Sequence, residues 1–79
     1  MIKKELILKD KNIKIKLHKE YLEFTKDSNY MVIAYKFIAN VYLNKLANIP
    51  LNLLVSLASK VPLFIIDHNG YVIAEVKHA

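Results

Sequence analysis

The chain has 79 residues, of which 54% are hydrophobic, with one glycine and two prolines, so it is one small folded domain and not a disordered segment. The absence of cysteine excludes disulfides, zinc–thiolate sites and thiol nucleophiles, and makes a reducing, cytoplasmic location the expectation. The net charge is +5, from twelve lysines against seven acids without any arginine, the side chain that specific DNA-reading proteins favour. No window of about 18–20 residues is free of charges and helix breakers, so we expect no transmembrane helix and no membrane partner.

The first third of the chain is predicted to form short strands joined by polar turns. A short apolar run, ELILKD, comes first, and NIKIKL then alternates strictly, with Lys14 and Lys16 on the face opposite its three apolar residues. YLEFT alternates again, with Leu22 and Phe24 on its apolar face, and KDSN predicts another turn. Lys14 and Lys16 are candidates for weak phosphate contacts, although a solvated strand face is the commoner reason for such lysines.

The segment YMVIAYKFIANVYLN can be drawn as a helix or as strands. We favour two strands, over residues 30–36 and 37–43, because the segment is rich in β-branched and aromatic residues. The next segment, NIPLNLLVSLASKVP, predicts a helix over about residues 50–60, with Pro50 at its first position and Pro62 beyond its end. Its polar residues form one narrow stripe, so we expect the helix to be buried around most of its circumference.

The last segment, LFIIDHNGYVIAEV, predicts a β-hairpin. Asn69 and Gly70 suit a two-residue type I′ turn, which pairs Ile66 with Ile73 and His68 with Tyr71. The fold class is therefore α+β: a small β-rich domain of two or three hairpins, mostly antiparallel, with one packed α-helix.

Both faces of this hairpin are apolar, and one helix can cover only one of them. The other face needs a cover that a chain of this length hardly supplies, which indicates a missing domain or a partner chain. Ile66, Ile73 and Tyr71 form the candidate dimer face, in a two-fold arrangement that sets the patch against itself.

No arrangement of residues indicates catalysis in this chain. The three histidines are far apart in sequence and lack the spacing of paired metal ligands, and a single glycine cannot form a phosphate-binding loop. We therefore assign no catalytic, cofactor-binding or metal-binding residue, and do not expect the chain to be an enzyme.

The order of the predicted elements is informative. It runs ELILK, then IKIKL–HKE–YLEF, then VIAYKFIANVYL, then PLNLLVSLASK, and finally VPLFIID–HNG–YVIAEV. This order resembles the N-terminal β-domain of the CRISPR-associated integrase/endonuclease of spacer acquisition, the first-numbered Cas protein. The resemblance covers nearly the whole chain, and it depends on spacing and hydrophobic character, with Gly70 as its sharpest single point.

The resemblance implies that residues 1–79 are one β-rich domain, the N-terminal part of a longer protein whose helical catalytic domain is absent here. In that family the catalytic domain supplies the Glu, His and Asp ligands of a divalent Mg or Mn ion, and His68 and His78 match none of them. The resemblance further implies a homodimer that also contacts its own C-terminal helical domain, a companion small adaptation protein and DNA, in antiviral defence. The alternative is a stand-alone small basic module that binds nucleic acid or protein through its lysine-bearing strands.

Overall fold

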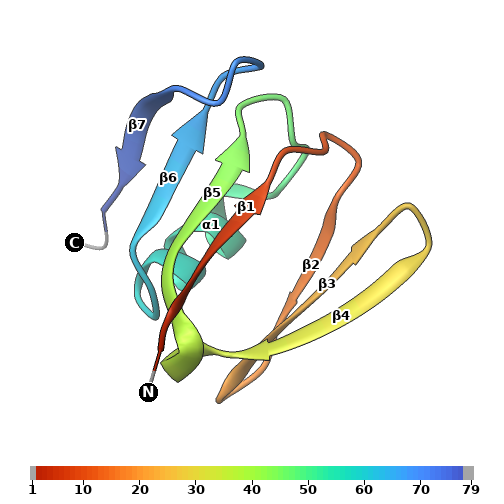
Figure 1. Cartoon of the computed structure of the whole chain (residues 1–79), viewed down its shortest axis with the longest axis vertical. Helices are drawn as coiled ribbons and strands as arrows, with labels where there is room; N and C mark the ends of the chain where they lie inside the picture. Colours follow the sequence, from red (N-terminus) through yellow and green to blue (C-terminus); the bar gives the residue numbers. More distant parts are fainter. Residues whose placement is uncertain (1, 78–79) are drawn as a thin grey trace.

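A computed structural model describes residues 2–77 of the chain and shows two β-sheets and one helix (Figure 1). The three-stranded sheet is an antiparallel meander in the order β2-β3-β4. The four-stranded sheet has the order β1-β5-β6-β7. The elements in chain order are β1 (Lys4–Leu8), β2 (Lys14–Leu17), β3 (Tyr21–Lys26), β4 (Asn29–Ala34), the short 3₁₀ helix η1 (Tyr35–Phe37), β5 (Ile38–Asn44), α1 (Leu51–Ala58), β6 (Leu63–Ile66) and β7 (Val72–Val76). The expected α+β class, rich in strands with one helix, is confirmed.

The alternating patterns of the first third become the meander as predicted. On β3, Leu22 and Phe24 are buried at 0% and 3% exposure, and Ile13, just before β2, is buried at 4%. The turn between β3 and β4 has two residues, Asp27 and Ser28, and both have positive φ angles of 49° and 69°. Lys26 pairs with Asn29 directly across it. A tight two-residue turn with two positive φ angles therefore joins β3 to β4, and the backbone twist of such a turn matches the right-handed twist of the flanking strands.

The segment from residue 29 to residue 44 forms two strands, as favoured above, but they belong to different sheets. The 3₁₀ helix η1 separates β4, the last strand of the meander, from β5, an inner strand of the four-stranded sheet. β4 pairs with β3, whereas β5 pairs with β1 and β6, so the two strands do not pair with one another.

Two of the three strand pairs in the four-stranded sheet are parallel. The sequence-based prediction of hairpins did not include parallel pairs. β1 lies parallel to β5, and β5 lies parallel to β6. Parallel neighbours need a long crossover connection. The helix α1 supplies the crossover from β5 to β6, and the whole three-stranded meander supplies the one from β1 to β5.

The helix is shorter and more exposed than predicted. Pro50 precedes the first helical residue in an extended conformation, with ψ of 143°, and the helix ends at Ala58. Only Leu57 is fully buried, whereas Leu51 and Val55 are 74% and 40% exposed. The expectation of burial around most of the circumference is wrong, because this short helix packs on the core along one side only.

One core holds the two sheets and the helix together. It contains the following buried residues: Leu8, Ile13, Leu22, Phe24, Ile38, Val41, Leu43, Leu57, Val61 and Leu63. Since these residues come from both sheets and the helix, the core lies on the inner face of the four-stranded sheet. The opposite, outer face of that sheet has no covering element among the described residues.

Candidate functional site

The tip of the β6–β7 hairpin differs from the predicted type I′ turn. Gly70 has a positive φ of 88°, but Asn69 does not, and the Gly70 amide donates to the Asp67 carbonyl at 3.0 Å. This is a four-residue turn from Asp67 to Gly70 that ends on the left-handed glycine, so Ile66 pairs with Val72 and not with Ile73. The predicted pairing of His68 with Tyr71 is also replaced, because the backbone of Tyr71 bonds to Asp67.

The side chain of Asp67 explains this change of turn. One of its carboxylate oxygens accepts hydrogen bonds from the backbone amides of Asn69 at 2.9 Å and Tyr71 at 3.0 Å. Aspartate commonly closes a turn in this way by bonding to its own following backbone. The hydrogen bond from Tyr71 lowers the pKa of Asp67, with that from Asn69 acting in the same direction.

Ile66 and Ile73 of the candidate dimer face lie on the outer face of the four-stranded sheet, whereas Tyr71 pairs with Asp67, the residue next to Ile66, and so does not lie on that side. Tyr71 and Ile73 are 71% and 53% exposed, whereas Ile66 is buried at 2% exposure. Ile66 is not part of the main core; it lines a depression beside Ile7 and Tyr42. The structure therefore brings Tyr71 and Ile73 to the surface of the hairpin and places Ile66 beneath it.

An apolar strip continues from this hairpin across the sheet. Tyr42 of β5 and Phe64 of β6 pair across the strands, and their rings stack with centroids 5.4 Å apart. Ile7 on β1 is 51% exposed. We call the surface formed by Ile7, Tyr42, Phe64, Val72 and Ile73 the outer apolar face.

Polar groups surround the outer apolar face. At one border, the Asn40 side-chain amide donates a hydrogen bond to the Glu5 carboxylate at 3.2 Å. At the other, the Lys77 amine lies 4.0 Å from the Glu75 carboxylate. An apolar centre with a polar rim is typical of protein interfaces.

The outer face of the three-stranded sheet has a different character. Lys14 and Lys16 are exposed on it as predicted, and Lys16 pairs directly with Glu23 of the next strand. His18 Nε2 lies 2.9 Å from Glu23 Oε1, and the Tyr30 hydroxyl donates to the same oxygen at 3.2 Å. The hydrogen bond with His18 lowers the pKa of Glu23. The carboxylate offsets part of the lysine charge, which makes this face suited at most to weak electrostatic contacts.

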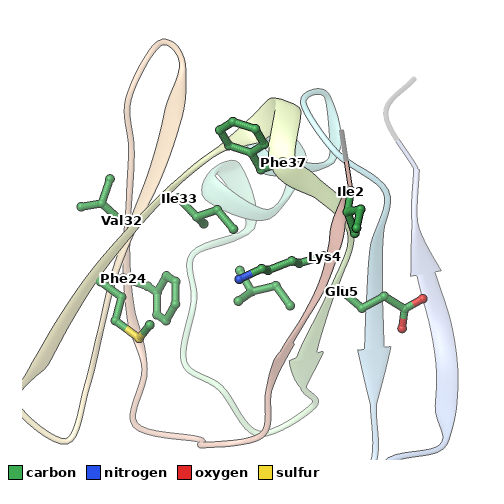
Figure 2. A pocket seen from close by; sticks show the side chains of 9 residues that line it. Ile2, Lys4, Glu5, Phe24, Val32, Ile33 and Phe37 are labelled. Carbon is green, nitrogen blue, oxygen red and sulfur yellow. The ribbon is translucent and has the colours of Figure 1, made fainter.

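A groove between the two sheets was not anticipated from the sequence. It has a volume of about 390 Å³ and is lined mainly by apolar side chains of β1, β4 and η1. Figure 2 shows Lys4 extending from β1 across this groove toward Phe24, while Glu5 points to the other side of the strand. The sequence signal that could have revealed it is Lys4 itself, because a lysine stands where the alternation with Leu6 and Leu8 calls for an inward residue.

The described residues contain no group of three His, Asp or Glu side chains that could hold a metal ion. His18 and His68 are far apart, on the meander and at the hairpin tip, and His78 lies outside the described residues. Within residues 2–77, no helix has the length and apolar character needed to cross a bilayer.

No protein-family model and no curated protein matches this sequence. The structure is similar to a chain of a partial Cas6-RT-Cas1–Cas2 complex, with a TM-score of 0.75 and 22% identity over 98% of this chain and 24% of that one. It is also similar to a chain of a Cas6-RT-Cas1–Cas2 complex, with a TM-score of 0.71 and 23% identity over 98% of this chain and 9% of that one.

These similarities confirm the expected resemblance at the level of the fold. The names of both complexes include Cas1, and the shared fold covers nearly all of this chain. The chain spans about a quarter or less of the length of the solved chains it matches.

Proposed function

We propose that this chain is the N-terminal scaffold domain of a CRISPR-associated integrase that acts in spacer acquisition, and that it performs no chemistry itself. The observation that carries the proposal is the fold, which is shared over 98% of the chain with parts of two Cas1-containing complexes. A domain that positions others needs a stable core and a surface for association, and it needs no reactive group.

In this proposal the outer apolar face is the dimer interface. Val72, Ile73 and Ile7 are each more than half exposed, and they continue into the stacked pair of Tyr42 and Phe64. Monomeric proteins rarely expose a continuous apolar strip on a sheet face, and a two-fold axis covers such a strip with its own copy. Full-length relatives would add the helical domain with its Mg or Mn ion, the companion adaptation protein and DNA as further partners.

Light scattering over a range of concentrations tests the association. We expect a dimer at about 100 μM, because an interface of standard size buries on the order of 800 Å² on each partner. A monomer at that concentration would contradict the dimer. Sequencing the genomic region around the coding frame tests the biological role: we expect a CRISPR array and neighbouring adaptation genes, and their absence would contradict that role.

A second candidate function, a free-standing basic module that binds nucleic acid, is supported by Lys14 and Lys16 on the outer face of the meander. Because Glu23 lies among these lysines, we expect DNA binding to be weak. Its affinity should fall steeply with salt, because the release of counterions from DNA contributes less free energy at higher salt concentration. Tight, sequence-dependent binding at about 0.2 M salt, measured by fluorescence anisotropy, would favour this second function over the scaffold.

A further inference from the structure

The groove of Figure 2 lies between two strands that each end a sheet. β1 pairs with β5 alone, and β4 pairs with β3 alone, so the facing edges of both strands are unpaired in the described structure. Ile2, Met31 and Phe37, which are 88%, 54% and 38% exposed, surround the opening. An unpaired edge beside an apolar groove is the arrangement that accepts an extended peptide as an added strand.

Lys4 gives this groove its chemical selectivity. It lies on the same side of β1 as Leu6, and its amine reaches over the apolar lining (Figure 2). Neither of the two ion pairs among the described residues involves it. Glu5, the next residue along the chain, points away and accepts a hydrogen bond from Asn40.

A charge in this position selects among incoming strands. A purely apolar strand would bury the Lys4 amine without a partner, which is costly and prevents indiscriminate edge pairing. A strand that brings a carboxylate to the amine removes this cost and gains a charge-assisted hydrogen bond. The groove therefore disfavours purely apolar strands and favours strands that carry a carboxylate, and such a difference in affinity is what makes an interface specific.

We propose that β1 and this groove bind an extended segment of another polypeptide, which adds to the edge of β1. Its groove-facing residues alternate as apolar, acidic, apolar, with the acid opposite Lys4 and the apolar residues beside Ile2 and Leu6. Since side chains of a strand alternate between its faces, the pattern is one acid with an apolar residue two positions away on each side.

The occupant is not a segment of these 79 residues contributed by a second copy. None of the seven acidic residues of this sequence has an aliphatic or aromatic residue two positions away on both sides. The acid of β7, Glu75, for example, has Ile73 on one side and Lys77 on the other. The groove also uses neither Tyr71 nor Ile73, so this proposal does not depend on the dimer.

The test uses a labelled peptide, Thr-Val-Thr-Glu-Thr-Val-Thr, with a matched peptide that has Gln in place of Glu. We expect the Glu peptide to bind saturably by fluorescence anisotropy and to shift the NMR signals of the β1 amides. We also expect Lys4→Glu to weaken its binding by about tenfold or more, as removal of a charge-assisted contact does. Lys3→Glu is the control, because it makes the same charge change at a neighbouring position that does not line the groove.

A charge exchange keeps the test independent of folding. The Lys4→Glu protein is expected to prefer the same peptide with Lys in place of Glu, a gain that a misfolded variant would not show. Equal binding of the Glu and Gln peptides, equal effects of the two lysine variants, or no shift of the β1 amides at about 1 mM peptide would overturn the proposal.

Discussion

Replacement of Ile73 by lysine should weaken the proposed dimer strongly. Ile73 is 53% exposed on the outer apolar face. Complete burial of an isoleucine contributes roughly 1.5–3 kcal/mol, so covering the exposed half contributes about 1 kcal/mol in each copy. A two-fold interface uses the residue twice, which gives about 2 kcal/mol, or about thirtyfold in the dissociation constant. Burial of the new amine adds a cost in the same direction.

Sedimentation velocity over a range of concentrations measures this dissociation constant directly. Leu51→Lys is the matched control. Leu51 is also an aliphatic side chain at the surface, 74% exposed, but it lies on the helix and not on the outer apolar face. Circular dichroism confirms that both variants remain folded. If the two variants dimerise equally well, or if both lose the dimer equally, the outer apolar face is not the interface.

Three further predictions concern stability. Gly70→Ala should cost about 1 kcal/mol, measured by urea unfolding, because φ is 88° there while no atom lies within 4 Å of the added methyl group. Leu57→Ala should cost about 2–5 kcal/mol in the same assay, since Leu57 is 1% exposed, whereas Leu51→Ala should change little. The hydrogen bonds to Asp67 lower its pKa, so its stabilising effect is present above the unfolded pKa and is lost as the pH falls through the lower folded value. Asp67→Asn should flatten that part of the stability profile; an unchanged acid profile would contradict the role of the turn.

The features that sequence could predict are those set by neighbouring residues. Strict alternation around Leu22 and Phe24 identifies a half-buried strand and its inward face, since side chains alternate along any strand. The apolar run after Pro50 identifies a helix for a similar local reason. The fold class followed from these patterns together with the order in which they occur.

The features that sequence missed depend on contacts between distant segments. Nothing in the alternation of β1 tells which strand pairs with it, so its parallel pairing with β5 was not foreseen. The turn at Asn69-Gly70 was misassigned because the Asp67 side chain captures the Asn69 and Tyr71 amides and imposes a longer loop. That aspartate was visible in the sequence and was the available signal.

The candidate dimer face shows the same division. Its place on the last hairpin followed from an apolar composition on both sides, and Tyr71 and Ile73 are exposed there. Ile66 is buried at 2% exposure; it pairs with Val72 and lies beside Ile7 and Tyr42 of the neighbouring strands. The extension to Tyr42 and Phe64 requires the register of β5 on β6, which no local pattern encodes.

The most direct measurement of the central claim is an isotope-filtered NMR experiment on a mixture of ¹³C-labelled and unlabelled chains. It detects only contacts between copies, and so it reports the interface without any substitution. The proposed dimer predicts intermolecular contacts from the methyl groups of Ile73 and Ile7 to the rings of Tyr42 or Phe64. Intermolecular contacts confined to Leu51 and Val55 of the helix, or none at a concentration of about 100 μM, would contradict it.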